Sequence, residues 1–268
     1  MSLSSSLDLL SEAKEFAPQT GIILGTGLGG LAKKIENPKS ISYDEIPGFP
    51  KSTTESHAGQ LTWGTLNGQR VVCMEGRFHY YEGYSLEEIT LPVRVMKALG
   101  IELLIVSNAA GGLNPQFESG DIMLIEDHIN LMGVNPLIGP NDDSLGPRFP
   151  DMIEPYHLET LATAEKCALA RGIKTHRGVY VGVLGPNLET RAEYRFLRQI
   201  GSDVVGMSTI PEVLVGVHAG LKILGLSCVT DMCLPDALKP ANIDEIIAVA
   251  TKAEPNMCQI VMDVLEKR

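Results

Sequence analysis

The chain has 268 residues, of which 44% are hydrophobic and 21% are charged, values that are ordinary for a globular protein and exclude long disorder and fibrous repeats. Its 22 Lys and Arg residues are outnumbered by 33 Asp and Glu residues, which gives a formal net charge of −11. An acidic protein of this kind has no bulk attraction for nucleic acid or for an anionic membrane, so any anion that it binds must be bound by a local site.

In the first half of the chain, short apolar runs between turn residues predict strands, and longer runs with a helical period predict helices. In chain order, the sequence predicts a helix at Leu7–Phe16, strands at Gly21–Leu24, Leu61–Leu66 and Arg70–Met74, a helix at Leu86–Leu99 and a strand at Leu103–Val106. Asn67-Gly68, between the second and third of these strands, is a strong hairpin signal. Glycine-rich segments at 25–30 (GTGLGG) and 108–114 (NAAGGLN) follow two of the strands and are predicted to be loops.

The second half of the chain alternates strands and helices on both sides of a long loop. Five prolines lie between Pro136 and Pro155, which predicts an irregular loop, and loops of this length are often functional. In chain order, the sequence predicts a strand at Asp121–Ile125, a helix at Leu158–Ala170, a strand at Val179–Val183, a helix at Glu189–Ile200, a strand at Val204–Met207, a helix at Pro211–Ala219, a strand at Lys222–Thr230 and a helix at Ile243–Leu265 that Pro255 is expected to break. Alternation of this kind predicts a layered α/β fold with a mostly parallel but mixed sheet.

The chain contains five cysteines, and none of them forms a C-x-x-C pair. We therefore expect buried, reduced thiols rather than zinc ligands or a redox pair at Cys73, Cys167, Cys228, Cys233 and Cys258. No uncharged apolar stretch approaches about 18 residues, and the N-terminal segment lacks the cationic and apolar regions of a signal peptide. The sequence therefore predicts a cytoplasmic protein without a membrane span.

The first glycine-rich segment matches the G-x-G-x-x-G pattern of dinucleotide-binding folds, and Asp44 lies about 20 residues further on, where such folds place an acidic residue. A single match of this kind is a weak signal. The same backbone N–H groups, with the hydroxyl of Thr26, would also suit a phosphate, and the glycines can equally form a plain turn. A structural turn, a phosphate site and a dinucleotide site therefore all stay open from this segment alone.

A second candidate site follows the strand that ends at Met74, in the segment EGRFHYYEGY. Arg77 and His79 are two positions apart, so they point to the same side of an extended chain. The guanidinium is a two-pronged donor that suits phosphate, and the imidazole adds a further donor. The alternative is a surface pair between Arg77 and a glutamate, beside a packed histidine.

Several long segments occur in one order along the chain, and together they closely resemble the trimeric purine nucleoside phosphorylases. They are GTGLGG, SHAGQ, EGRFHYYEGY, SNAAGGLNP, GPNDDSLGPRFPDM, GPNLETRAEY and VVGMSTIPE. The resemblance spans about residues Gly21 to Ala219, with looser similarity to the end of the chain. It implies a single domain over residues 1–268 with a three-layer α/β/α fold and a mixed, partly barrel-like central β-sheet, and it removes the dinucleotide interpretation of GTGLGG.

The resemblance also implies a reaction, the reversible phosphorolysis of purine nucleosides in purine salvage. Inorganic phosphate attacks C1′ of a purine ribonucleoside or deoxyribonucleoside and releases the free base and (deoxy)ribose 1-phosphate. Phosphate is a co-substrate, and no metal, organic cofactor, nucleic acid or membrane is expected to take part. A homotrimer is implied, in which Phe149, from the proline-rich loop, contributes to the sugar pocket of the neighbouring subunit.

Matched position by position, the resemblance implies a phosphate site formed by Thr26, His57, Arg77, His79, the backbone of Ala109, and Ser208. The sugar would lie against Tyr81 and Met207. The purine would be bound by Glu189, Val205, Gly206, Thr230 and Asp231, against a wall of Ala109 and Ala110 and with Ile243 near the ribose 5′ position. The residues expected to act in catalysis are His79, Glu189 and Asp231.

These residue types suit the chemistry, because cleavage of the glycosidic bond places positive charge on the sugar and negative charge on the departing purine. An anionic phosphate beside C1′ stabilises the first charge, and hydrogen-bond donors at the base stabilise the second. Glu189, as a carboxylate, can accept hydrogen bonds from N1–H and the 2-amino group of guanine.

Three positions depart from the pattern of family members that select 6-oxopurines. Asp231 stands where those enzymes carry Asn, Ile243 stands where they carry a His near the 5′-hydroxyl, and Thr26 replaces a Ser. An ionised Asp231 would accept from the 6-amino group of adenine, whereas a protonated Asp231 beside Glu189 could donate to N7. The alternatives are therefore a phosphorylase that prefers adenosine or methylthioadenosine and, more remotely, an NAD-binding oxidoreductase or a purine sensor without catalysis.

Overall fold

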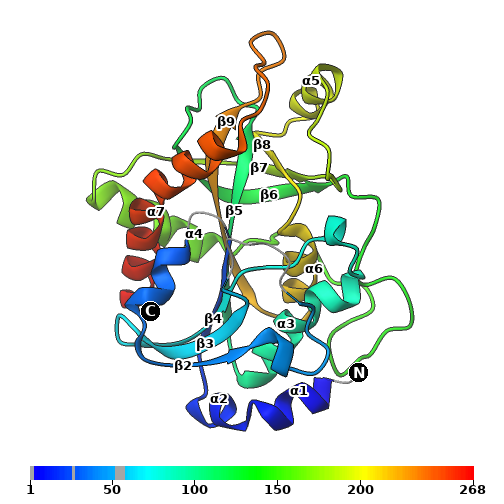
Figure 1. Ribbon diagram of the computed structural model, residues 1–268, viewed down its shortest axis with the longest axis vertical. Coiled ribbons are helices and arrows are strands. Elements are labelled where there is room, and N and C mark those ends of the chain that lie inside the picture. Colours follow the sequence, from blue (N-terminus) through cyan, green and yellow to red (C-terminus); the bar gives the residue numbers. More distant parts are fainter. Residues whose placement is uncertain (1–2, 26–27, 52–57) are drawn as a thin grey trace.

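The computed structural model describes residues 3–25, 28–51 and 58–268 (Figure 1). Its strands form one mixed sheet in the order β2-β3-β4-β1-β5-β8-β7-β6-β9, and β5 also pairs directly with β9. This second pairing closes the last five strands of that order into a barrel, from which β1, β4, β3 and β2 extend as an open sheet. The strands are β1 (Thr20–Leu24), β2 (Glu36–Ser42), β3 (Gln60–Leu66), β4 (Gln69–Glu75), β5 (Leu103–Gly112), β6 (Ile122–Asn130), β7 (Thr175–Gly182), β8 (Val204–Gly206) and β9 (Lys222–Met232).

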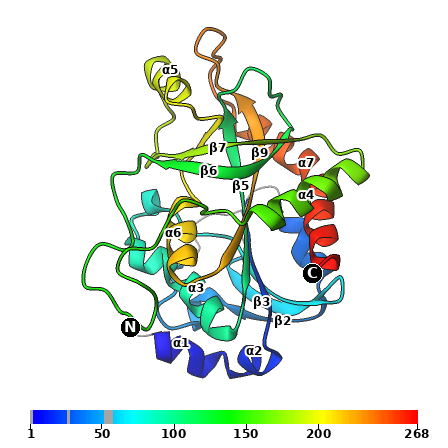
Figure 2. The ribbon, with the colours of Figure 1, turned by 180° about the vertical axis from the view of Figure 1, so that it is seen from behind.

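Helices cover both faces of this sheet and so form the outer two of three layers (Figures 1 and 2). α4 and α7 pack on one face, and α3 and α6 pack on the other, with α1 and α2 beside α3. The helices are α1 (Leu3–Leu9), α2 (Ser11–Phe16), α3 (Leu86–Leu99), α4 (Leu158–Ala170), α5 (Arg191–Gln199), α6 (Ile210–His218) and α7 (Ile243–Glu266), with 3-10 turns η1 (Gly29–Lys34), η2 (Tyr43–Glu45) and η3 (Tyr80–Glu82).

The central strands are buried on both faces, because successive side chains of a strand point to opposite sides of the sheet. In β1, Ile22 packs into the core under α4 and α7, whereas Ile23 packs into the core under α3 and α6. In β5, Ile105 and Val106 divide in the same way. Continuous apolar runs therefore indicate these strands correctly.

The predicted α/β fold with a mixed, partly barrel-like sheet is confirmed, and every predicted strand and helix has a counterpart. Two details differ at the start of the chain. The predicted helix at Leu7–Phe16 is divided into α1 and α2 at Leu10. The edge strand β2 was not predicted, because its residues ENPKSIS are mostly polar and exposed. It pairs with β3 through backbone groups and through the hydroxyls of Ser40 and Thr62, which lie 2.8 Å apart.

The prediction of a loop at NAAGGLN is wrong, because residues 108–112 continue β5. Gly111 and Gly112 pair with β8 on one side and with the end of β9 on the other. A Cβ on Gly111 would lie 2.6 Å from Sγ of Cys233. Glycine here marks a close approach between strands rather than a turn.

The predicted break at Pro255 is also wrong, because α7 runs without interruption from Ile243 to Glu266. Proline removes the N–H that would bond to the carbonyl of Thr251. Both Pro255 and Thr251 lie on the exposed side of α7, where water can satisfy that carbonyl. Ala253 and Met257 are buried on the opposite side and hold the helix against the sheet.

All five cysteines are buried and free, as predicted. Burial raises the pKa of Cys228 and of Cys258 to about 12, so these thiols stay protonated and unreactive at neutral pH. Among the described residues, no helix combines the length and the apolar character needed to cross a membrane.

Candidate active site

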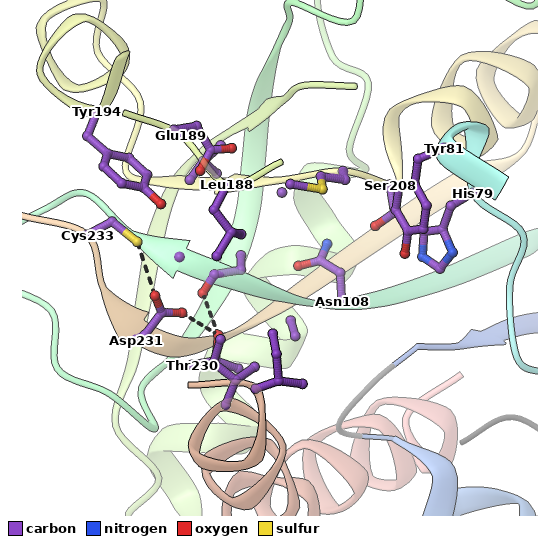
Figure 3. A pocket seen from close by; sticks show the side chains of 18 of the residues that line it. His79, Tyr81, Asn108, Leu188, Glu189, Tyr194, Ser208, Thr230, Asp231 and Cys233 are labelled. Atoms are coloured by element: carbon purple, nitrogen blue, oxygen red, sulfur yellow. Dashed lines mark hydrogen bonds between the residues drawn. The ribbon is translucent and has the colours of Figure 1, made fainter. Parts of the chain in front are cut away.

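A cavity of about 250 Å³ lies where the carboxyl ends of β5 and β9 meet β8, and η3, the loop before α5 and the start of α7 complete it (Figure 3). Open α/β sheets commonly bind ligands at this edge. Most residues of the implied site line this cavity, namely Arg77, His79, Tyr81, Ala109, Ala110, Glu189, Val205, Gly206, Met207, Ser208, Thr230, Asp231 and Ile243.

Three residues of the implied site are not among them. Thr26 and His57 lie outside the described residues. Phe149 lies on the long loop between β6 and α4, where it is 86% exposed and the guanidinium of Arg148 is 5.7 Å from its ring centre. Within one chain, the structure therefore does not bring Phe149 to the cavity.

At one end of the cavity, Arg77 is only 3% exposed. Its Nε donates to Oε1 of Glu212 at 3.1 Å, and its Nη1 donates to the carbonyl oxygen of Ser107 at 2.5 Å. Nη1 also lies 3.3 Å from Oγ of Ser208 and 3.4 Å from Oγ1 of Thr209. Nη2 is buried and has no partner in the described part of the chain. Because an unpaired buried donor costs about 1–3 kcal/mol, this nitrogen is suited to meeting an anion.

A tight turn before α6 presents two hydroxyls to this guanidinium. Thr209 has φ +70° and ψ −51°, and the N–H of Ile210 donates to the carbonyl oxygen of Ser208 at 2.7 Å, which makes a γ-turn. The hydroxyl of Tyr180 lies 3.2 Å from the N–H of Ser208 and supports the turn. A positive φ at a β-branched residue is strained, and such strain is concentrated at functional sites.

The first glycine-rich segment begins at the same end of the cavity. The N–H of Gly25 donates to Oγ of Ser107 at 3.1 Å. A Cβ on Gly25 would lie 2.3 Å from the carbonyl oxygen of Ser107 and 3.2 Å from Nη1 of Arg77. A residue with a side chain could not come so close to this strand, and the contact with the guanidinium favours the phosphate interpretation of GTGLGG.

His79 and Tyr81 line the cavity beside Ser208 (Figure 3). Nδ1 of His79 lies 2.8 Å from Oε1 of Glu82, and the backbone N–H of His79 donates to the same oxygen at 2.8 Å. The rings of His79 and Tyr81 are stacked with their centroids 4.7 Å apart. Glu82 thus fixes the orientation of the imidazole and leaves Nε2 as the nitrogen directed away from it.

At the opposite end, two carboxylates lie close to three neutral donors (Figure 3). Oγ1 of Thr230 donates to Oδ1 of Asp231 at 2.9 Å, and Sγ of Cys233 donates to Oδ2 at 3.2 Å. The hydroxyl of Tyr194 hydrogen-bonds to Glu189. Both oxygens of Asp231 therefore accept hydrogen bonds, which is the arrangement of a carboxylate that acts as an acceptor.

Burial raises the pKa of Glu189 above its ordinary value, and the negative charges of Glu193 and Asp231 add to the effect. Hydrogen bonds from its own backbone and from Tyr194 oppose this shift. Burial also raises the pKa of Cys233 and of Tyr194, so both remain protonated donors. A carboxyl group with a raised pKa in a cavity is typical of a functional site.

Between the two ends, the lining is small and apolar. It comprises Ala109–Gly111 from β5, Val205–Met207 from β8 and the turn after it, and the side chains of Leu188, Ile243 and Ile246. Small residues let a flat ring approach the backbone closely, with polar groups left to read its edge. The arrangement can therefore hold an anion at one end and a planar heterocycle at the other.

Sequence reasoning missed several residues of the site. Nδ2 of Asn108 donates to Oγ1 of Thr209 at 2.9 Å, and its Oδ1 has no partner among the described residues. Asn108 and Glu212 both lie inside the segments SNAAGGLNP and VVGMSTIPE, so their position in those segments was the available signal. Leu188 and Tyr194 likewise lie inside the segment GPNLETRAEY, whereas nothing local in the sequence sets apart Cys233 and Ile246.

Within residues 3–25, 28–51 and 58–268, no group of three or more His, Cys, Asp or Glu side chains is placed to hold a metal ion. The polar groups at the cavity are hydrogen-bond donors and two separate carboxylates, a set that suits an anion and a heterocyclic base better than a cation.

The chain matches the family model described as the phosphorylase superfamily over residues 19–266. It is 53% identical over 249 residues to purine nucleoside phosphorylase 1 of Bacillus subtilis, and the alignment covers 93% of this chain and 92% of that protein. Crystal structures of Schistosoma mansoni purine nucleoside phosphorylase in complex with adenosine and with inosine match this chain with TM-scores of 0.93 and 0.94. Their sequence identities are 41% and 40%, and each match covers 99% of this chain and 96% of the other.

Proposed function

The chain belongs to the purine nucleoside phosphorylases of the phosphorylase superfamily, and on this premise we propose which of its residues carry the reaction. The enzyme moves the sugar of a purine nucleoside to inorganic phosphate. A phosphate oxygen forms a bond to C1′, the bond from C1′ to N9 breaks, and the base leaves and takes up a proton. The observation that carries the assignment is the buried Arg77, whose Nη2 has no described partner, in one cavity with Glu189 and Asp231.

Phosphate is proposed to bind at the Arg77 end of the cavity. Nη2 of Arg77, the hydroxyl of Ser208 and Nε2 of His79 would contact its oxygens. The backbone of Ala109 and the side chains of Thr26 and His57 complete the proposed phosphate site. Because Arg77 is already fixed by neighbouring groups, the anion meets a donor whose orientation needs no further ordering.

The sugar is proposed to lie between the two ends, against Tyr81 and Met207. Positive charge grows on the sugar as the bond to N9 lengthens, and the phosphate next to C1′ stabilises it. Ile243, together with Leu188 and Ile246, places apolar surface at the cavity. We place the 5′ position of the ribose there, where an apolar 5′ substituent would be tolerated better than in a polar pocket.

The purine is proposed to lie against Ala109, Ala110, Val205 and Gly206, with its polar edge toward Glu189 and Asp231. An ionised Glu189 accepts a hydrogen bond from N1–H of a 6-oxopurine. Asp231 already accepts hydrogen bonds from Thr230 and Cys233. It is therefore suited to accept a further hydrogen bond from a 6-amino group, or from N7 after N7 has taken up a proton. We infer that 6-aminopurine nucleosides are used beside 6-oxopurine nucleosides, and the similar Schistosoma enzyme binds one of each kind.

We also infer a homotrimer in which Phe149 of one subunit covers the sugar pocket of the next. Phe149 and Ile153, on the loop at 136–155, are 86% and 90% exposed. Large apolar side chains that gather on a surface mark sites of contact with another molecule. Each subunit would be a single domain over residues 1–268 that acts in purine salvage in the cytoplasm.

Base release from inosine, measured with and without inorganic phosphate, tests the proposed function. We expect release to require phosphate, to yield sugar 1-phosphate in equal amount, and to be unaffected by NAD. Release without phosphate would indicate hydrolysis, and binding without release would indicate a sensor; either would contradict the proposal. Comparing initial rates with inosine, guanosine, adenosine and methylthioadenosine then measures the base preference.

A further inference from the structure

Behind the proposed phosphate site lies a buried carboxylate that makes no proposed contact with substrate. Glu212, in the first turn of α6, is as buried as Arg77, and its Oε1 accepts from Nε of that residue at 3.1 Å. A surface pair between Arg77 and a glutamate was one of the two interpretations of its segment. The actual partner is 135 positions away and lies in the core.

We propose that Glu212 is a positioning residue that also sets the charge of the phosphate site. It holds the guanidinium of Arg77 so that Nη2 faces the anion, and it offsets the positive charge so that phosphate and sugar 1-phosphate can leave as well as bind. This inference rests on the proposed function, because it takes Arg77 to be the residue that meets phosphate.

The orientation follows from the planarity of the guanidinium. Glu212 occupies Nε, while the carbonyl of Ser107 and the hydroxyls of Ser208 and Thr209 surround Nη1. Once these two nitrogens are fixed, the direction of the third is fixed as well. Nη2 is also the nitrogen without a described partner, so the pair with Glu212 selects which N–H groups are presented to a ligand.

The effect on charge follows from the composition of the cavity. Among its described lining residues, Arg77 is the only Arg or Lys, whereas Glu189 and Asp231 are both acidic. Glu212 adds a negative charge directly behind the arginine. A phosphate that enters this site therefore meets no excess of positive charge from these four side chains, and its binding depends on directed hydrogen bonds.

Little water screens this pair. Tyr156 and Tyr180 are fully buried beside it, and burial raises the pKa of each. The charge of Glu212 contributes to the increase at both tyrosines, whereas the charge of Arg77 opposes it at Tyr180. Charges act strongly over short distances in such surroundings, so the loss of the glutamate charge should be felt at the phosphate site.

Two substitutions at Glu212 separate charge from orientation. Glu212→Gln keeps an oxygen that can accept from Nε but removes the negative charge, so we expect the KM for phosphate and the inhibition constant for ribose 1-phosphate to fall by about 5- to 10-fold. We expect kcat to fall as well, because the phosphorylated product leaves more slowly. Glu212→Ala removes the acceptor too, so the guanidinium is no longer held and the KM for phosphate should rise.

Opposite changes of the KM for phosphate in the two variants would support the inference. If Glu212 were a purely structural residue, both variants would change that KM in the same direction. A rise in phosphate KM in both variants, or no change in either, would overturn it. Melting temperature gives a second readout: Glu212→Gln should be less stable without phosphate and should gain more from added phosphate than the unmodified enzyme. If Glu212→Gln does not fold, Glu212→Asp is measured instead; it keeps the charge, so a tighter phosphate interaction in that variant would overturn the inference.

Two controls separate this inference from the proposed function. Asp263→Asn breaks another ion pair, in which Asp263 meets Arg171 at 2.8 and 2.9 Å far from the cavity, and it should lower stability without changing the KM for phosphate. Arg77→Lys tests the phosphate site itself. If Arg77→Lys leaves the KM for phosphate unchanged, the proposed function of this site is contradicted. If Arg77→Lys raises that KM while both Glu212 variants change it in the same direction, only the role of Glu212 is contradicted.

Discussion

At the phosphate end of the cavity, Arg77 and Glu212 are enclosed by β5, the γ-turn at Thr209 and the first turn of α6, all of which belong to the core. At the purine end, Glu189 lies on the loop before α5, and Ile243 begins α7 at 60% exposure. Attack by phosphate is common to every substrate, and the groups proposed to bind phosphate are held by packing that tolerates little change. Of the groups proposed to read the base and the 5′ position, Glu189 and Ile243 lie on segments that can change without disturbing the core.

The largest loss is expected at the buried end. Arg77→Met removes the proposed phosphate donor and leaves Glu212 buried without its partner. We expect kcat/KM for phosphate to fall by about 10²- to 10³-fold, because loss of a buried charged contact costs about 3–4 kcal/mol. Initial rates at varied phosphate measure the effect, and a value near that of the unmodified enzyme would show that the two ends do not differ as described.

A smaller loss, confined to one class of substrate, is expected at the purine end. Glu189→Gln weakens the acceptor for N1–H, so kcat/KM for inosine and guanosine should fall by about 10- to 100-fold, the range for hydrogen bonds to charged groups. The KM for phosphate should stay within about twofold, since the two ends are separate. An equal rise in the KM for phosphate would show that the ends are coupled.

The pH dependence should sharpen the same comparison. Because burial raises the pKa of Glu189, its proton is taken up at a higher pH than for an ordinary glutamate, and the carboxylate needed for N1–H is lost as pH falls through that raised value. The kcat/KM for inosine should therefore fall about tenfold per pH unit below it. Adenosine has an acceptor at N1, to which protonated Glu189 can donate, so its profile should not show this limb. Identical profiles for the two substrates, measured from pH 4 upward while the fold is monitored, would contradict this assignment.

Base preference should respond to the neighbouring carboxylate. Asp231→Asn supplies an amide that can donate to N7 and O6, so the ratio of kcat/KM for adenosine to that for inosine should fall by about tenfold, equivalent to about 1.4 kcal/mol. Either Thr230 or Cys233 can still donate to the remaining oxygen, and the other can accept from the new amide group, so the fold should be unaffected. If inosine and guanosine already far exceed adenosine in the unmodified enzyme, the role given to Asp231 is wrong.

The smallest effect is expected from the residue furthest from the core. Phe149→Ala should raise the KM for inosine by about 3- to 5-fold, because burial of an aromatic side chain against the sugar is lost. The KM for phosphate should change little. Light scattering on the same variant checks that the oligomeric state is retained, and equal changes in both KM values would contradict a site shared between subunits.

Local sequence patterns correctly predicted the elements whose ends are marked by capping residues. α3 begins after Ser85, whose hydroxyl accepts from the N–H of Glu88, and ends at Gly100 with φ +115°. Both features are encoded in a few adjacent residues. The continuation of β5 through a glycine-rich stretch and the intact α7 at Pro255 depend instead on what packs beside them, so local patterns predicted them wrongly.

The site divides in a similar way. Its chemistry-bearing residues were predicted from the family resemblance, and most of those that are described lie at one cavity. The pair of Arg77 with Glu212, and the contact of Tyr194 with Cys233, form when distant segments come together in the fold. Such contacts carry no local pattern, so the structure was needed to find them.

β5 contributes to both ends of the cavity without interruption. Ser107 accepts from Arg77, and Ala109–Gly111 lie along the proposed purine slot. At about 3.3 Å per residue, Ser107 and Gly111 are about 13 Å apart along this strand. Because β9 pairs with β5 throughout that interval, while β1 pairs with β5 just before it and β8 at its end, the interval is held by the sheet. A nucleoside analogue with one extra methylene between sugar and base would be too long for this fixed span. It could place its base in the purine slot or its sugar beside the phosphate site, but not both together.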